Sequence, residues 1–454
     1  MKLRSINPAN EKLLGEFEAH TFDEALAFTH AARAEQKLWA RKPISGRCVL
    51  LKKLGAVVRA HGEESAKLIT LEMGKPITQS RAEMEKCASL CDYYAEAAPE
   101  FLRDEAIATD YKKSYVRFDP IGVILGIMPW NFPFWQVFRF TIPALAAGNG
   151  AVLKHSSNVP QCALKIEELF NEAGFPEGLF KTLLIDAKTS DQLVESDAVD
   201  AISLTGSTPA GAEVAKRAGA NLKKCVLELG GSDPFIVLAD ADIDLACKVA
   251  LQARTINTGQ SCIAAKRFIL ERAIADEFEN KLLKHFKTLK MGDPMDSTVN
   301  IGPLAKAEIR ADLERQVDDA VSKGAQLLVG GHANTGKGYF FEPTLLSNIT
   351  PEMAVYREEV FGPVMTLFTV NDSAEAVQLA NSSEFGLGAS IWTKDAAVAE
   401  EMAAKIEAGF VAINGMVKSD PRLPFGGVKK SGFGRELGSY GIKEFVNIKT
   451  VVIN

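Results

Sequence analysis

Cysteine and histidine are sparse in this chain of 454 residues, and neither forms a disulfide or metal-binding pattern. The seven cysteines include no CxxC pair, and an odd number does not complete a disulfide framework, which favours reduced thiols. The six histidines stand singly, without an HExxH motif or a Cys/His cluster. We therefore expect no protein-bound metal.

Blocks of one charge and an apolar leader are also missing. The formal net charge of -6 is spread along the sequence, which favours neither a nucleic acid nor an anionic membrane as a partner. No apolar core follows Lys2 and Arg4, so we expect a cytoplasmic location rather than export. The expected partners are small molecules.

The longest stretch without charge, residues 120–138, approaches the length of a membrane span. Pro129 and Pro133 would interrupt a helix there, and Asn131 and Gln136 would lie in lipid. Residues 121–128 instead have the pattern of a short buried strand that ends at a loop. We favour the buried strand over a transmembrane helix.

Two common phosphate-binding patterns are absent or incomplete. There is no GxGxxG, and residues 331–338 (GHANTGKG) have Gly where a phosphate loop has Ser or Thr, so we interpret them as a surface turn. Residues 205–211 (TGSTPAG) are better placed, because they follow a strand and open a helix whose N–H groups could meet a pyrophosphate.

Helical and strand-like segments alternate over most of the chain, and no fixed-period repeat is present. Helical spacing is found at residues 63–73, 81–98, 161–173, 210–218, 275–289, 306–323 and 374–379, and strand-like runs at 151–154, 201–204, 224–229, 235–238, 326–329 and 364–370. This rhythm predicts an α/β fold with a doubly wound parallel sheet that binds ligands at the carboxyl ends of its strands. A second α/β unit follows Cys262.

Cys262 and Glu228 supply a nucleophile and a base. A thiol that attacks a carbonyl and a carboxylate that activates water are what a covalent acyl-enzyme route needs. Each also has a simpler interpretation, since Cys262 could be a core cysteine and Glu228 a solvated carboxylate at a strand end. The polar, Gly-containing approach to Cys262 and the Gly pair after Glu228 favour the catalytic interpretation.

Seven short motifs together resemble those of the aldehyde dehydrogenase superfamily, in order and over essentially the whole chain. They are PWNFP at 129–133, LK at 153–154, TGST at 205–208, LELGG at 227–231, GQSC at 259–262, EVFGP at 359–363 and PFGG at 424–427. Within the superfamily the sequence is most similar to bacterial succinic semialdehyde dehydrogenases of the short type.

The resemblance implies a division into three parts. These are a cofactor-binding domain with an atypical Rossmann sheet (1–103 and 121–227), an α/β catalytic domain (228–430) and a small β oligomerisation extension (104–120 and 431–454). Residues 111–118 and 446–453 have strand-like patterns that suit such an extension. A homodimer or homotetramer is expected on the same basis.

The resemblance also implies a catalytic set. Cys262 attacks the aldehyde, and Asn131 with the backbone N–H of Cys262 stabilises the oxyanion. After hydride transfer, Glu228 activates the water that hydrolyses the thioester. Taken alone, Asn131 would be interpreted as a turn residue.

A nicotinamide cofactor is implied by a further group of positions. Trp130 lies beside the site, Lys154 binds the adenosine ribose, and the turn containing Gly206, Ser207 and Gly211 meets the pyrophosphate, with Glu359 and Phe361 at the nicotinamide half. Three residues beyond Lys154, where members that prefer NAD usually have Glu, this chain has Ser157. A small neutral residue leaves room for a 2′-phosphate, so NADP is predicted over NAD, with NAD still possible.

Substrate choice depends on fewer positions. By resemblance, Arg139 and Ser419 hold the distal carboxylate of succinic semialdehyde, although composition alone also allows a surface Arg139 and a loop-capping Ser419. Glutaric semialdehyde or another ω-carboxylated aldehyde is the alternative substrate. A second anion-binding Arg found in family members is Ile256 here, which leaves open whether Arg254 compensates, and Ala264 replaces a regulatory Cys.

Other classes fit less well. A thiol hydrolase lacks a His partner for its Cys, a CoA-acylating dehydrogenase would not need Glu228, and a structural protein would not need the Cys, Glu and Asn set.

Overall fold

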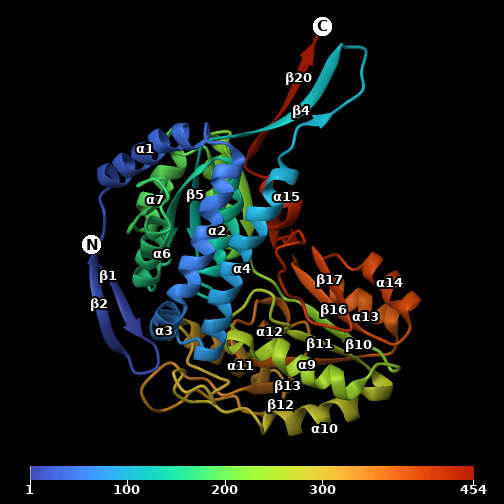
Figure 1. The fold of residues 1–454 in the computed structure, drawn as a ribbon. Coiled ribbons are helices and arrows are strands. Elements are labelled where there is room, and N and C mark those ends of the chain that lie inside the picture. The colour runs from blue at the N-terminus through green and yellow to red at the C-terminus, as the bar shows by residue number, and fades with distance from the viewer. Residues whose placement is uncertain (1) are drawn as a thin grey trace.

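The computed structural model describes residues 2–454 as two lobes of helices and sheets, with a narrow arm projecting from the first lobe (Figure 1). Each lobe contains one mainly parallel sheet, so the α/β prediction is confirmed. No helix among the described residues is long and apolar enough to cross a membrane.

The first lobe contains a six-stranded sheet in which only the edge strand β19 is antiparallel. In spatial order its strands are β19 (Gly432–Phe433), β9 (Lys224–Glu228), β8 (Ala201–Thr205), β5 (Val123–Met128), β6 (Gly150–His155) and β7 (Phe180–Thr182). The central strands β5 and β8 are buried along most of their length, which is the pattern of parallel sheets covered by helices on both faces.

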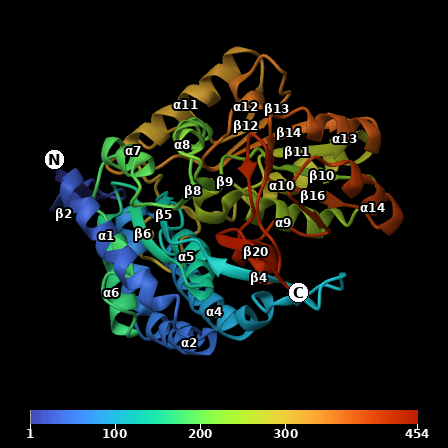
Figure 2. The same ribbon diagram turned by 90° about the horizontal axis from the view of Figure 1, so that it is seen from above.

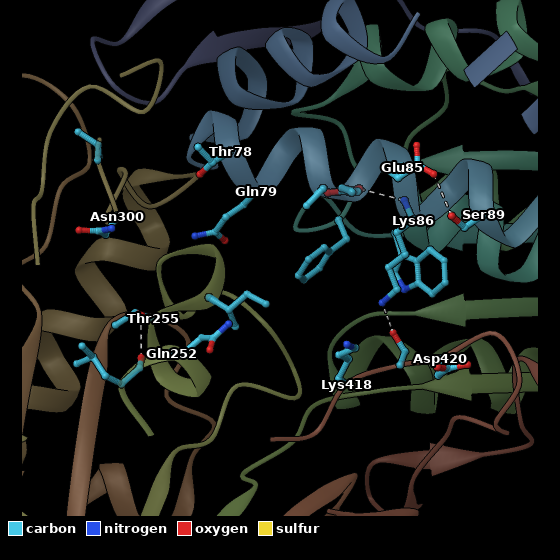
Figure 3. Close-up of a pocket in the computed structure, with 18 of the residues that line it drawn as sticks. Thr78, Gln79, Glu85, Lys86, Ser89, Gln252, Thr255, Asn300, Lys418 and Asp420 are labelled. Carbon is cyan, nitrogen blue, oxygen red and sulfur yellow. Dashed lines mark hydrogen bonds between the residues drawn. The ribbon is translucent and has the colours of Figure 1, made fainter. Parts of the chain in front are cut away.

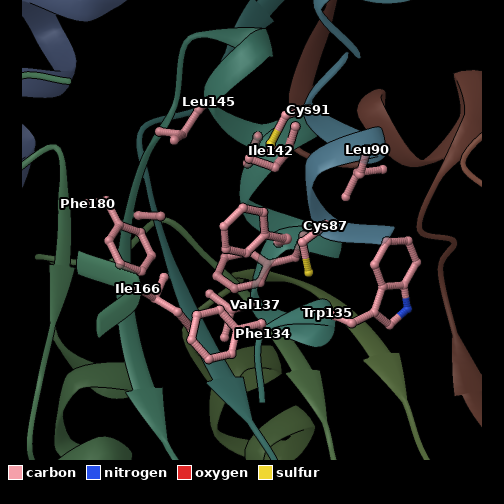
Figure 4. Close-up of a cluster of buried hydrophobic side chains, with 14 of the residues drawn as sticks. Cys87, Leu90, Cys91, Phe134, Trp135, Val137, Ile142, Leu145, Ile166 and Phe180 are labelled. Carbon is pink, nitrogen blue, oxygen red and sulfur yellow. The ribbon is translucent and has the colours of Figure 1, made fainter. Parts of the chain in front are cut away.

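Of the nine helices that the described residues form in this lobe, four match the predicted segments and five were not predicted. The helices are α1 (Phe22–Trp39), α2 (Ile44–Ala60), α3 (Gly62–Met73), α4 (Ile77–Phe101), α5 (Trp135–Ala147), α6 (Pro160–Glu172), α7 (Ala187–Glu195), α8 (Thr208–Ala220) and α15 (Gly438–Ile442). The uncharged run forms β5 and then leads into α5, all of whose residues are buried. Because α5 is buried on every face, its sequence lacks the solvent-facing side that marks a surface helix. Figure 4 shows its side chains, among them Val137 and Ile142, packed against Cys87 and Leu90 of α4.

The second lobe contains a seven-stranded sheet that is parallel except for β12. In spatial order its strands are β12 (Gln326–Val329), β13 (Thr344–Ser347), β14 (Val364–Val370), β11 (Arg267–Glu271), β10 (Pro234–Val237), β16 (Gly388–Trp392) and β17 (Phe410–Ile413). Its helices are α9 (Ile243–Thr255), α10 (Ala275–Phe286), α11 (Ala307–Ser322), α12 (Ala354–Arg357), α13 (Ser373–Asn381) and α14 (Ala396–Lys405). The predicted strands at 326–329 and 364–370 are confirmed.

The arm is an antiparallel sheet of β3 (Glu105–Ala106), β4 (Lys113–Pro120) and β20 (Val446–Ile453). It draws on both segments predicted for the extension. Residues 432–442 of the second segment, however, do not reach the arm, because β19 pairs with β9 and α15 packs against α4 and α5.

Seen from above, β9 lies on the side of the first sheet that is nearer the second lobe (Figure 2). The carboxyl ends of β5, β8 and β9 meet at one edge of that sheet, since the strands are parallel. The segments that precede β11 and β14 approach the same edge from the second lobe, because Cys262 lines one cavity together with the residues after those three strands. This junction contains the candidate site.

Candidate active site

A cavity of about 250 Å³ lies at the junction and brings together residues from both lobes. The first lobe contributes residues that directly follow three strands: Pro129, Trp130 and Asn131 after β5, Gly206 and Ser207 after β8, and Leu229 and Gly230 after β9. The second lobe contributes Cys262, Ile309, Glu359 and Phe361, and Gln136 and Thr205 complete the wall. Seven of the residues predicted from sequence therefore face one cavity.

The loop before Cys262 has an unusual backbone. Asn257, Thr258 and Gly259 are successive residues with positive φ, at 51°, 56° and 75°. A Cβ atom on Gly259 would lie 2.1 Å from the carbonyl oxygen of Gly362, in the loop that carries Glu359 and Phe361. Only glycine fits there, so the Gly of the GQSC motif lets the two loops pack together.

Replacing Gly259 with Ala is expected to destabilise the protein by about 2–4 kcal/mol, because the methyl group adds a clash to a strained conformation. Urea unfolding of the purified variant measures this effect. Gly219→Ala is the matched control, since no atom lies within 4 Å of its Cβ position in α8 and its φ is ordinary, and it should change stability little or improve it. An equal midpoint for the two variants would refute the packing role of Gly259.

Arg254 holds the same two loops from beneath. Its Nη2 donates hydrogen bonds to the carbonyl oxygens of Gly259, Val360 and Gly362, and its Nη1 donates to that of Ala265. The side chain is fully buried and lines neither of the cavities at the junction. Arg254 is therefore a structural residue and does not take the place of the anion-binding Arg that Ile256 replaces.

Lys266 is a site residue that sequence reasoning missed. Its Nζ donates to the carbonyl oxygens of Ser261 and Cys262, at 3.1 and 2.7 Å, and lies 3.6 Å from a carboxylate oxygen of Glu359. Glu359 in turn accepts a hydrogen bond from the backbone N–H of Gly231 at 3.1 Å. The only signal in the sequence is a Lys just before a buried strand.

The thiol of Cys262 is half-buried and faces the cavity. Burial raises the pKa of this thiol to about 12, although the positive charges of Arg139 and Lys266 act in the opposite direction. The thiol is thus protonated at neutral pH, and the proton has to leave before Sγ can attack.

Asn131 is oriented by two hydrogen bonds beside Cys262. Its Oδ1 accepts from Nε2 of Gln136 at 3.1 Å, and its Nδ2 donates to the carbonyl oxygen of Gln260 at 3.0 Å. These bonds fix the amide and leave the second hydrogen on Nδ2 unused within residues 2–454. The backbone N–H of Cys262 also makes no hydrogen bond within these residues. Two donors are therefore available near the thiol.

Glu83 fixes the start of α5, which follows Asn131. Its carboxylate accepts from the backbone N–H groups of Phe134 and Trp135 at 2.9 and 3.0 Å, and it forms a buried ion pair with Lys75.

Glu228 lies at the end of β9 and does not line the cavity. It is buried, neither carboxylate oxygen has a hydrogen-bond partner among the described residues, and one oxygen would lie 2.7 Å from a Cβ on Gly426. Burial raises the pKa of its carboxyl well above the ordinary value, against the opposing charge of Arg139. In this conformation the carboxylate of Glu228 does not reach the cavity that Cys262 lines.

Arg139 is buried beneath the site in an ion pair with Glu436, and its Nη2 lies 3.3 Å from Oγ1 of Thr205. It lines neither cavity at the junction. The structure therefore does not bring the predicted carboxylate-binding Arg to a surface that a substrate could reach in this conformation.

The predicted cofactor-binding residues form two groups. One group lines the cavity with Cys262 and consists of Trp130, Gly206, Ser207, Glu359 and Phe361, and the other, which does not line it, consists of Lys154, Ser157 and Gly211. Lys154 is the penultimate residue of β6, and exposed Ser157 lies in the turn before α6. His155, which ends the strand, is buried, and burial lowers its pKa to about 4 and leaves it neutral. Gly211 does not face the cavity: a Cβ there would lie 2.5 Å from Leu229, so this glycine lets α8 pack closely.

A larger cavity of about 860 Å³ is lined by Phe132, whereas Asn131, the residue before it, lines the first cavity. One side is formed by α4, with Lys86, and Lys418 and Asp420 lie across from it (Figure 3). Ser419 lines this cavity and accepts a hydrogen bond from Nζ of Lys86 at 2.6 Å. Sequence reasoning found Ser419 but not Lys86.

The model of the aldehyde dehydrogenase family matches residues 1–451. The chain belongs to the aldehyde dehydrogenase family. It is 52% identical, over the full length of both chains, to a probable succinate-semialdehyde dehydrogenase (NADP+) of Synechocystis. It is also 47% identical to the succinate semialdehyde dehydrogenase (NAD(P)+) Sad of Escherichia coli, over 98% of this chain and 97% of that one.

Solved structures of this aldehyde dehydrogenase's relatives share its fold. The crystal structure of succinic semialdehyde dehydrogenase from Streptococcus pyogenes in complex with NADP+ matches with a TM-score of 0.97 at 39% identity, over 99% of both chains.

Proposed function

We propose that the protein oxidises succinic semialdehyde to succinate with NADP+. The main supporting observation is that Cys262 shares one cavity with Asn131 and Glu359. A second cavity is lined by Phe132, the residue after Asn131, and contains Lys86 and Ser419. The names of the relatives point to the same substrate and cofactor.

The test is direct. Purified protein mixed with succinic semialdehyde and NADP+ should raise the absorbance at 340 nm, and mixing with succinate or with cofactor alone should not. Absence of a signal with a panel of carboxylated aldehydes would contradict the proposal.

In this mechanism, the thiol proton of Cys262 passes to water and returns to the thiolate at the end of the cycle. Sγ attacks the aldehyde carbon, and the resulting oxyanion accepts hydrogen bonds from Nδ2 of Asn131 and the backbone N–H of Cys262. Bound NADP+ supplies the hydride acceptor. Glu228 then takes a proton from water, the hydroxide attacks the thioester carbonyl, and Cys262 leaves as a thiolate. The sum is aldehyde, NADP+ and water giving carboxylate, NADPH and protons.

The residues at the first lobe's edge fit such a dinucleotide. Ser207 is the N-cap residue of α8, is exposed, and makes no side-chain capping bond, so the helix N-terminus can receive a pyrophosphate. In this proposal Lys154 would bind the ribose, and Ser157 would leave room for its 2′-phosphate. Glu359 and Phe361, with Trp130 edge-on to the Phe361 ring, would hold the nicotinamide half.

Replacing Ser157 with Glu is expected to shift the ratio of kcat/KM values for NADP+ and NAD+ by about 10- to 100-fold towards NAD+, because a carboxylate repels the 2′-phosphate. Fluorescence titration with NADPH and NADH measures the same shift in binding. Ser157→Ala separates loss of the hydroxyl from the added charge. An unchanged ratio in Ser157→Glu, or a wild type that prefers NAD+, would argue against this assignment.

We also propose a cytoplasmic homodimer or homotetramer that assembles through the arm. Ile448 and Val452 share one face of β20 and are large apolar side chains exposed by 61% and 45%, which is a surface suited to another subunit.

A further inference from the structure

The charges around the larger cavity are not balanced. Its three acidic residues each pair with a nearby cation: Glu83 with Lys75, Glu85 with Arg59 and Asp420 with Arg422. Its three lysines, Lys86, Lys248 and Lys418, have no carboxylate within ion-pair distance among residues 2–454. The cavity therefore presents uncompensated positive charge, which favours an anionic ligand.

Lys86 differs from the other two lysines. Lys248 and Lys418 are exposed, whereas Lys86 is half-buried, with its Nζ 4.0 Å from the centre of the Trp135 ring and 2.6 Å from Oγ of Ser419. These two contacts hold the ammonium group in one place at the cavity wall. A fixed cation next to a hydroxyl donor is a suitable receptor for a carboxylate.

We infer that Lys86, together with Ser419, binds the distal carboxylate of the substrate, a role that the sequence assigned to Arg139. This inference rests on the proposed function. Arg139 already has a carboxylate partner in Glu436 and lines neither cavity, so binding a substrate there would require breaking a buried ion pair. Lys86 gains an anionic partner without losing one.

The pKa of Lys86 is consistent with a missing anionic partner. Burial lowers the pKa of the Lys86 ammonium to about 8, and the positive charge of Arg139 acts in the same direction. A bound carboxylate opposes both effects, because it supplies the negative charge that the site lacks.

Lys86→Gln tests the inference with two aldehydes of equal chain length, succinic semialdehyde and butanal. We expect kcat/KM for succinic semialdehyde to fall by about 10- to 100-fold, mostly through KM, and that for butanal to change less than about 3-fold. Lys418→Gln is the matched control, since it removes an exposed cation from the opposite side of the same cavity. Lys86→Arg should recover part of the preference for the carboxylated aldehyde.

A second measurement does not depend on turnover. Calorimetric titration with succinate should show weaker binding to Lys86→Gln than to the wild type and to Lys418→Gln. Equal losses for succinic semialdehyde and butanal, or unchanged succinate binding, would overturn the role of Lys86 and return it to Arg139. If the wild type itself does not prefer succinic semialdehyde to butanal, the proposed function fails instead.

Discussion

Glu228→Gln is expected to leave formation of the first NADPH almost unchanged and to slow thioester hydrolysis by about 10²- to 10⁴-fold. The amide keeps the shape of the side chain but cannot take a proton from water. Stopped-flow absorbance at 340 nm should therefore show one rapid burst per active site, followed by a steady rate far below that of the wild type.

The pH dependence of the steady-state rate is a second test of the role of Glu228. Burial raises the pKa of Glu228, so near that pKa only a fraction of the enzyme molecules carry an ionised Glu228. The carboxylate is the form that can take a proton from water. The steady-state rate of the wild type should fall as the pH falls through this raised pKa, and that step should be missing in Glu228→Gln. Loss of the burst together with the steady rate would show that Glu228 acts before the thioester forms.

Cys262→Ala is expected to reduce aldehyde oxidation by more than about 10⁴-fold, because no covalent intermediate can form. Titration with NADPH should still show binding, since the side chain lost is small and its loop is held by Arg254 and Lys266. Mass spectrometry of the wild type, quenched during turnover, should find the acyl group on the peptide that contains Cys262.

The control for this variant is Cys225→Ala. Cys225 is the other half-buried cysteine among the described residues, and burial raises the pKa of its thiol to about 11, so it is a similar thiol away from the cavity. Its loss should leave activity near the wild-type level. Substantial activity in Cys262→Ala would disprove the nucleophile assignment.

Residues with local signals could be predicted from the sequence. Cys262, Asn131 and Glu359 lie in short motifs at the ends of elements, and parallel strands bring such ends to one edge of a sheet. The helix α5 was not predicted, because it is buried on all its faces and has no solvent-facing side.

The electrostatic partners were harder to predict, since they depend on contacts between distant segments. In the sequence Arg139 is a lone cation after an uncharged run. Its ion-pair partner, Glu436, lies near the C-terminus, far from it in the sequence. Lys86 appeared as one of many helical lysines, until the fold placed it against Ser419. Whether a charge is free or paired is a property of tertiary structure.

The pairing of β19 with β9 also affects how the protein is made. Gly432 lies opposite Glu228, and Phe433 opposite Leu227. During synthesis the ribosome has to reach this late segment before β9, which ends in Glu228 and already pairs with β8, can gain its second neighbour. The peptide containing Cys262 has emerged long before. A nascent chain therefore carries the thiol well before the environment of its base is complete, and an unfinished polypeptide is expected to be inactive.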